Sequence, residues 1–89
     1  MIQLYSNIPK IDLHGYDRDY AKIVINDFIR DNYSMKIQKV AIIHGNGTGI
    51  LRKTTHETLK KNKLVSAYKL DNFNSGTTIV ELQKKIDRN

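Results

Sequence analysis

Four short stretches of the chain have the apolar patterning that is typical of β-strands. Residues Ile11–His14 alternate between apolar and polar, which indicates a strand with one buried face. The continuous apolar run Val40–Ile43 is typical of a strand buried on both faces. The runs Val65–Leu70 and Thr77–Leu82 are rich in β-formers and are joined by the turn-forming residues 72–76, so we expect an antiparallel hairpin there.

Two segments between these stretches carry apolar residues at helical spacing. The first runs from about Arg18 to Asp31, with Asp17 placed to cap its first turn. The second runs from Ile50 to Lys61. The stripes expected to face the core are Ala21, Val24, Ile25, Phe28 and Ile29 in the first helix, and Leu51, Thr55, Thr58 and Leu59 in the second.

The order of these elements is βαβαββ, which predicts an α/β fold. A strand reached through a crossover helix pairs in parallel with the strand before the helix, whereas the hairpin adds an antiparallel pair. We therefore expect a two-layer sandwich in which a mixed four-stranded sheet packs against two helices. The 89 residues support one domain, expected over residues 10–84, with residues 1–9 as a lead-in and residues 85–89 as a polar tail.

The amino-acid composition excludes several kinds of site and indicates where the protein is located. It has no cysteine, which excludes disulfides, thiolate metal ligands and a cysteine nucleophile. No segment approaches the roughly 20 apolar residues of a membrane span, and residues 1–10 lack the apolar stretch of a signal peptide. We therefore expect a cytoplasmic protein without membrane contact. Lys and Arg number 15 against 9 Asp and Glu, a net charge of +6, so the surface either attracts polyanions or is simply a solvated basic surface.

A carboxylate and an imidazole stand two residues apart at the end of the first expected strand. On a strand, residues two apart share a face, so Asp12 and His14 are expected to project together. Such a pair can act as a base and its orienting group, or as two ligands of a divalent metal. The alternative is a histidine that hydrogen-bonds locally at a strand end, and the tetrapeptide Asp12–Gly15 leaves both interpretations open.

A glycine-rich loop follows the second expected strand. Glycines at every second position permit positive φ and expose successive main-chain N–H groups, and the loop opens into a helix whose N-terminus favours an anion. This pattern predicts a phosphate-binding loop; the alternative is a tight turn whose glycines serve packing alone. The spacing fits neither a P-loop nor a dinucleotide fingerprint. The residues expected to bind the phosphate are Gly45, Asn46, Gly47, Thr48, Gly49 and Arg52.

Further candidate contacts lie on the second expected helix and beside His14. Lys53, His56 and Lys60 are spaced so that they can share one helix face, which either follows a phosphate backbone or is a solvated surface. Tyr16 follows the first motif closely and can stack on an unpaired base.

The two motifs together resemble the Smr (small MutS-related) domain, in the form of a stand-alone small member. That family's hallmarks are an L-D-L-H-G strand and an H-G-x-G-x-G-x-L-R loop, which residues 11–15 and 44–52 match. Residues 76–82 resemble the family's last strand, so the likeness covers about residues 11–82. The resemblance implies a fold similar to the C-terminal domain of bacterial translation initiation factor three.

The resemblance also implies nucleic-acid binding and, in many members, DNA-nicking or RNA-cleaving activity. The family's functional positions correspond to Asp12 and His14 in the first motif and to His44, Gly45, Gly47, Gly49 and Arg52 in the second. The chain departs from the pattern at Ile11, which replaces a leucine, and at residues 74–76, where the family's loop is usually richer in glycine.

Our leading hypothesis is therefore an endonuclease, that is, a phosphodiester hydrolase acting on DNA or RNA. His14, oriented by Asp12, would activate water or a ribose 2′-hydroxyl, and Arg52 would stabilise the developing charge. His44 would protonate the leaving oxygen. A divalent metal, magnesium or manganese, stays open as an alternative, but Asp12, His14 and His44 would be few protein ligands for it, so no metal site is assigned. The rival hypothesis is a non-catalytic module, monomeric or weakly dimeric, that docks on nucleic acid or the ribosome.

Overall fold

The structure, a computed structural model, describes residues 7–86 and has the expected βαβαββ order within them. The expected lead-in at residues 1–6 and the end of the expected tail at residues 87–89 lie outside the described residues. The elements are β1 (Lys10–Asp12), α1 (Arg18–Ser34), β2 (Lys39–Ile43), α2 (Ile50–Lys61), β3 (Val65–Asp71) and β4 (Asn74–Leu82).

The four strands form one mixed sheet in the order β1-β2-β4-β3, which confirms the predicted fold. β1 pairs with β2 in parallel, with Lys10 opposite Ala41 and Asp12 opposite Ile43. β4 is antiparallel to both β2 and β3, so β3 runs in the same direction as β2 with β4 inserted between them. Consequently β1, β2 and β3 all end at one side of the molecule, called here the carboxyl end of the sheet.

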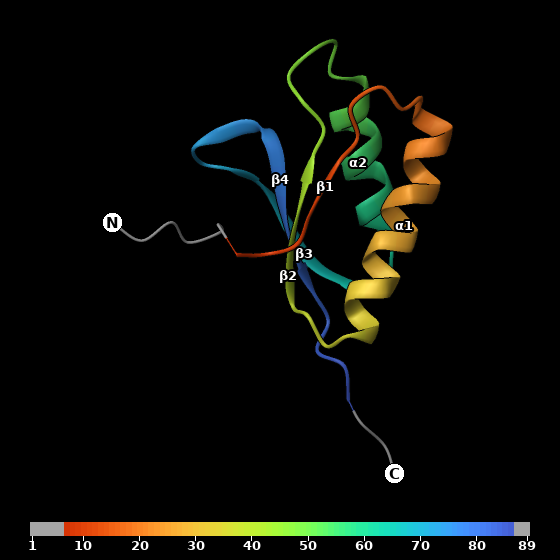
Figure 1. Cartoon of the computed structure of the whole chain (residues 1–89), viewed down its shortest axis with the longest axis vertical. Helices are drawn as coiled ribbons and strands as arrows, with labels where there is room; N and C mark the ends of the chain where they lie inside the picture. The colour runs from red at the N-terminus through yellow and green to blue at the C-terminus, as the bar shows by residue number, and fades with distance from the viewer. Residues whose placement is uncertain (1–6, 87–89) are drawn as a thin grey trace.

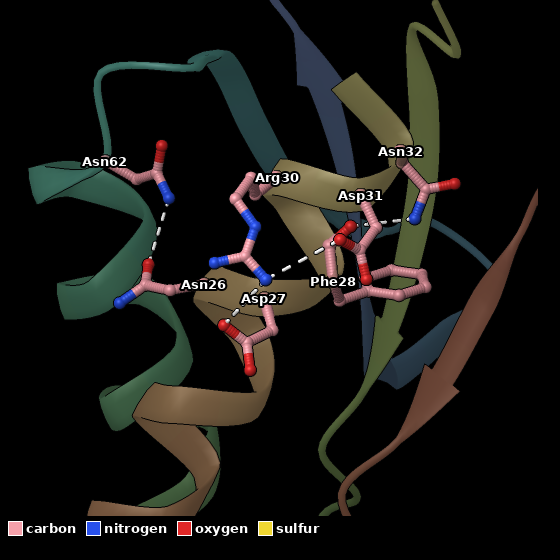
Figure 2. Close-up of polar contacts among 7 residues, drawn as sticks. All are labelled: Asn26, Asp27, Phe28, Arg30, Asp31, Asn32 and Asn62. Carbon is pink, nitrogen blue, oxygen red and sulfur yellow. Dashed lines mark hydrogen bonds and ion pairs between the residues drawn. The ribbon is translucent and has the colours of Figure 1, made fainter. Parts of the chain in front are cut away.

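Both helices cover the same face of the sheet, which produces two layers (Figure 1). Each helix returns the chain between strands that run in the same direction, so α1 and α2 are parallel and both begin at the carboxyl end of the sheet (Figure 1). Near their C-terminal halves the helices are linked by Asn62, whose Nδ2 donates to Oδ1 of Asn26 at 2.9 Å (Figure 2).

The core lies between the helix pair and the sheet and follows the predicted stripes closely. Ala21, Ile25 and Ile29 of α1 are fully buried, and Val24 and Phe28 pack against them half-buried. From α2 the buried residues are Leu59 and a group of threonines, Thr54, Thr55 and Thr58. Thr58 stays hydrogen-bonded when buried because its Oγ1 donates to Thr54 O, one turn earlier, at 2.8 Å, whereas the buried Thr55 Oγ1 has no hydrogen-bond partner among the described residues.

Three element boundaries differ from the sequence-based expectation by more than one residue. α1 begins as predicted, with Asp17 Oδ1 accepting from Tyr20 N at 2.8 Å, but it continues three residues past Asp31. The buried Asn32 keeps its Nδ2 hydrogen-bonded by donating to Phe28 O at 2.8 Å (Figure 2), although its Oδ1 has no hydrogen-bond partner among the described residues. The helix ends only where Lys36 adopts a φ of 64°. β1 stops at Asp12 rather than His14, and β4 begins at Asn74, so the hairpin turn is shorter than expected.

Candidate functional site

The two sequence motifs leave neighbouring strands at the carboxyl end of the sheet. Leu13 N donates to Ile43 O at 2.9 Å, one residue beyond the pairing of Asp12 with Ile43. The chain after β1 and the chain after β2 therefore emerge side by side, and each leads into a helix N-terminus (Figure 1). The parallel pairing of β1 and β2 brings together two motifs that are about thirty residues apart in sequence.

The first motif is a turn and not the end of a strand, so the expected strand geometry of Asp12 and His14 is wrong. Asp12 Oδ1 accepts from the main-chain N of His14 at 2.9 Å, and this bond turns the chain around the fully buried Leu13. The Asp12 carboxylate thus holds the His14 backbone. Both side chains are exposed, and within residues 7–86 no hydrogen bond engages the imidazole ring of His14. That ring is accessible to a substrate.

The glycine loop, residues 45–49, is open to solvent as the phosphate-binding interpretation requires. Gly45 and Gly49 have φ of 77° and 87°, which favours glycine at both positions, and residues 45–48 are exposed. Gly49 is the N-cap of α2 and supplies no side-chain cap, and the first turn of α2 holds no acidic residue. Thr48 Oγ1 makes one long contact of 3.3 Å with Ile50 N. The positive end of the α2 dipole is therefore left without a counter-charge from its own first turn.

The beginning of β4 holds the glycine loop in place. Gly76 O accepts from the main-chain N of both His44 and Gly45 at 2.9 Å, and Ser75 Oγ donates to Asn46 Oδ1 at 2.9 Å. The amide of Gly45, expected to bind phosphate, is thus already used inside the protein, and that expectation is wrong. The amides left for a ligand begin at Asn46.

Gly76 is a functional position that sequence reasoning undervalued. It is buried, and a Cβ there would stand 3.2 Å from Cα of Gly45 and 3.3 Å from Nδ2 of Asn46. The segment 74–76 was interpreted as a glycine-poor version of the family's loop. Gly76 is the one glycine in this segment. The close approach of β4 to the glycine loop requires a glycine at that position.

Arg52 extends back over the glycine loop from the first turn of α2. Its Nη2 lies 3.6 Å from the point that a Cβ on Gly49 would occupy. The side chain is exposed, and in the described part of the chain it makes no ion pair. A guanidinium placed above an open helix N-terminus supplies the donors for a bidentate phosphate contact.

A buried hydroxyl joins two imidazoles beneath the loop. Thr78, on β4, has no exposed surface, and its Oγ1 lies 2.8 Å from His44 Nε2 and 2.7 Å from His56 Nε2. His44 Nδ1 lies 3.0 Å from Gly45 O, and because a carbonyl only accepts, Nδ1 carries the proton. His44 Nε2 then accepts from the Thr78 hydroxyl, whose oxygen accepts from His56. Sequence reasoning missed Thr78 because the alternation of β4 shows only that it faces inward.

This network changes the roles expected of the two histidines. His56 was predicted on an exposed face with Lys53 and Lys60; the lysines are exposed, but His56 turns inward to Thr78 and packs on Tyr68 at 5.1 Å between ring centroids. His44 is only 7% exposed with both ring nitrogens engaged. That geometry argues against His44 as the proton donor to a leaving oxygen and makes it a support for the loop.

Burial and neighbouring charge keep both imidazoles neutral. Desolvation lowers the pKa of His44, the hydrogen bond to the Gly45 carbonyl partly opposes this, and the charge of Arg52 lowers the pKa by a smaller amount. Desolvation also lowers the pKa of His56, and His44 and Arg52 add to the effect. The charge at this site is therefore carried by Arg52 and not by the histidines.

The remaining candidates lie at the margins of the site. Tyr16 is 36% exposed and meets Tyr20 edge-on, with 4.9 Å between ring centroids. Among residues 7–86, no three His, Asp or Glu side chains form a group that could hold a metal ion. No helix in the described residues is long and apolar enough to cross a bilayer.

Fold and site together define a class: a small α/β domain whose open glycine loop, uncapped helix N-terminus and unpaired arginine suit an anion. The chain belongs to the Smr domain family, which matches residues 11–83. It is 38% identical over 85 residues to the endonuclease MutS2 of Clostridium acetobutylicum, covering 92% of this chain and 11% of that protein. It is 39% identical over 77 residues to the endonuclease MutS2 of Clostridium botulinum, covering 83% of this chain and 10% of that protein. The chain thus spans about a tenth of the length of these relatives.

Two solved structures share the fold. The Smr domain of Thermus thermophilus MutS2 superposes with a TM-score of 0.82 at 24% identity, over 85% of this chain and 99% of that one. YdaL, a stand-alone small MutS-related protein from Escherichia coli, superposes with a TM-score of 0.79 at 24% identity, over 84% of this chain and 64% of that one. The family resemblance deduced from the two motifs is confirmed.

The close approach at Gly76 predicts an unequal response to two glycine-to-alanine changes. Gly76→Ala places a methyl group against the Gly45 backbone and should lower the free energy of unfolding by about 1–3 kcal/mol. Gly47→Ala, whose Cβ would meet nothing within 4 Å, should change it by less than about 0.5 kcal/mol. Urea denaturation followed by circular dichroism measures both, and equal losses would contradict the role given to Gly76.

The lowered pKa values of His44 and His56 predict that acid destabilises the fold. Below the unfolded pKa of 6.5 the unfolded chain binds protons that the folded chain excludes, so the free energy of unfolding should fall as the pH drops from about 7.5 to 5.5. His56→Gln retains a donor for Thr78 but does not titrate, so its stability should depend less steeply on pH. Urea midpoints at several pH values test this, and an unchanged slope in the variant would be the contrary result.

Proposed function

We propose that this chain binds DNA or RNA at the carboxyl end of its sheet and hydrolyses a phosphodiester bond there, as a nicking endonuclease. The observation that carries the proposal is the exposed glycine loop on an uncapped helix N-terminus, with Arg52 above it and the accessible His14 on the neighbouring strand end. Its relatives in the Smr family include proteins named endonuclease MutS2, which supports the same chemistry.

The binding step rests on charge that the fold concentrates around the loop. Main-chain amides from Asn46 onward and the α2 dipole would hold one phosphate, with Arg52 bidentate to it. Further phosphates would follow a hollow between the two helices, whose rim at the helix N-termini carries Arg18, Lys22 and Lys53. The hollow continues along the helices to Lys61 at the end of α2, and among the described residues Glu57 is the one acidic residue that lines it. This path includes the predicted contact Lys53 but not Lys60.

The chemical step is assigned to His14. Its imidazole would take a proton from water, or from a ribose 2′-hydroxyl in RNA, while the oxygen attacks phosphorus and the bond to the leaving oxygen breaks. Arg52 would stabilise the extra negative charge on the phosphorus oxygens. Asp12 acts as a positioning residue by fixing the His14 backbone, and the leaving oxygen takes its proton from solvent. No step is routed through a metal, because the described residues form no group that fits one.

Removing the Arg52 guanidinium should weaken binding more than removing a matched arginine. Arg52→Ala should raise Kd for a labelled oligonucleotide about ten- to hundredfold and reduce the salt dependence by about one counterion. Arg30→Ala changes net charge equally, but Arg30 lies about 18 Å along α1 from the N-terminus of that helix and is paired to Asp27 and Asp31 (Figure 2). Fluorescence anisotropy at several salt concentrations compares them. Equal losses would mean that only net charge matters.

Cleavage of supercoiled plasmid and of structured RNA tests the catalytic assignment. His14→Ala should retain binding while its turnover falls about 10²- to 10⁴-fold, and Asp12→Ala should lose turnover through the loosened turn. Each protein is assayed with and without a chelator, which also tests for a required divalent ion. Equal activity of wild type and both variants would point to a contaminating nuclease. Salt-sensitive binding without cleavage by the wild type would favour the rival, non-catalytic module.

A further inference from the structure

The turn of the β3–β4 hairpin presents an aromatic ring to solvent. Phe73 is 91% exposed, far above the exposed fraction of the other large apolar side chains in the described residues. The turn beneath it is ordered, because Phe73 N donates to Asp71 Oδ1 at 3.0 Å and Asp71 pairs with Asn74. Two asparagines, Asn72 and Asn74, flank the ring. Burial in the core therefore does not account for an aromatic residue at this position.

Hydrogen bonds hold the hairpin turn that contains Phe73 at a set distance from the glycine loop. Gly76 and Ser75, on the strand that follows the turn, are hydrogen-bonded to His44, Gly45 and Asn46. Phe73 lies three residues before Gly76, which corresponds to about 10 Å along an extended strand. The β3–β4 hairpin, whose turn contains Phe73, bends away from the two helices (Figure 1).

We propose that Phe73 is a stacking platform for an unpaired base of the strand whose phosphate occupies the glycine loop. This inference rests on the proposed function and names its substrate class: nucleic acid with unpaired bases beside the bound phosphate. The bases inside a duplex are covered on both faces by their neighbours, whereas an unpaired base offers a free face to an aromatic ring. A reach of about 10 Å corresponds to roughly three nucleotides of a stacked strand.

The chemistry around the ring fits a base better than an apolar partner. Asn72 is exposed beside Phe73, and its amide can donate to and accept from a base edge. Lys69, on the strand leading to the turn, is also exposed and can meet a phosphate. Because stacking is tolerant of base identity, we expect a preference for unpaired structure with little preference for sequence.

The test compares variants on two oligonucleotides of the same sequence, one single-stranded and one fully paired, each containing a fluorescent adenine analogue. Phe73→Ala should weaken binding to the single strand about five- to hundredfold and leave duplex binding within about twofold. It should also abolish the quenching of the analogue that stacking produces. Phe73→Tyr keeps the ring and should behave as wild type. Ile23→Ala, which removes another exposed apolar side chain from α1, should change neither affinity.

The possible outcomes distinguish a failure of the stacking role from a failure of the proposed nucleic-acid binding. A wild type that binds neither oligonucleotide overturns both. A wild type that binds, together with a Phe73→Ala variant that loses both affinities equally or loses neither, overturns base stacking alone. A Phe73→Ala variant that changes its oligomeric state in size-exclusion chromatography assigns the ring to a contact between copies and likewise overturns the stacking role.

Discussion

One main-chain carbonyl determines the shape of the site. Gly76 O binds the amides of His44 and Gly45, and the missing side chain of Gly76 lets β4 come close enough to do so. Because those two amides are satisfied within the protein, the glycine loop leaves its strand in a set direction and only its distal part is open to a ligand. The position of the hairpin turn, and with it Phe73, depends on the same contact.

Beneath the loop, a polar network is buried without burying charge. His44, Thr78 and His56 satisfy one another, and the lowered pKa values keep both imidazoles neutral near pH 7. Neutral, fully bonded groups are tolerated in a low-dielectric interior, whereas an imidazolium there would be desolvated and repelled by Arg52. Arg52, beside Gly49, thus carries the positive charge that the buried network does not, which is the arrangement that suits an anionic ligand.

The residues of the candidate site come from segments that are distant in sequence. They lie near one another because three strands end at the carboxyl end of the sheet. β1 and the turn after it supply Asp12 and His14, β2 leads to the glycine loop and Arg52, and β3 leads to the exposed turn. Parallel strands bring their following loops to one end of a sheet, and each crossover helix adds the positive end of a dipole there. A domain of this size can therefore bring the proposed binding, catalytic and stacking groups to one end of its sheet.

The chain's own periodicities determined the elements, their order and most of the core, because burial of an apolar stripe is a local property of spacing. The positive φ of Gly45 and Gly49 and the start of α2 directly after the glycine loop could likewise be predicted from sequence, since both are local features. The inward turn of His56, the bond of Asp12 to the His14 backbone and the use of the Gly45 amide were decided only by tertiary structure. Each of these features depends on a contact with another residue or on a reversal of the chain. The spacing of residues along the sequence does not show where that contact or reversal lies.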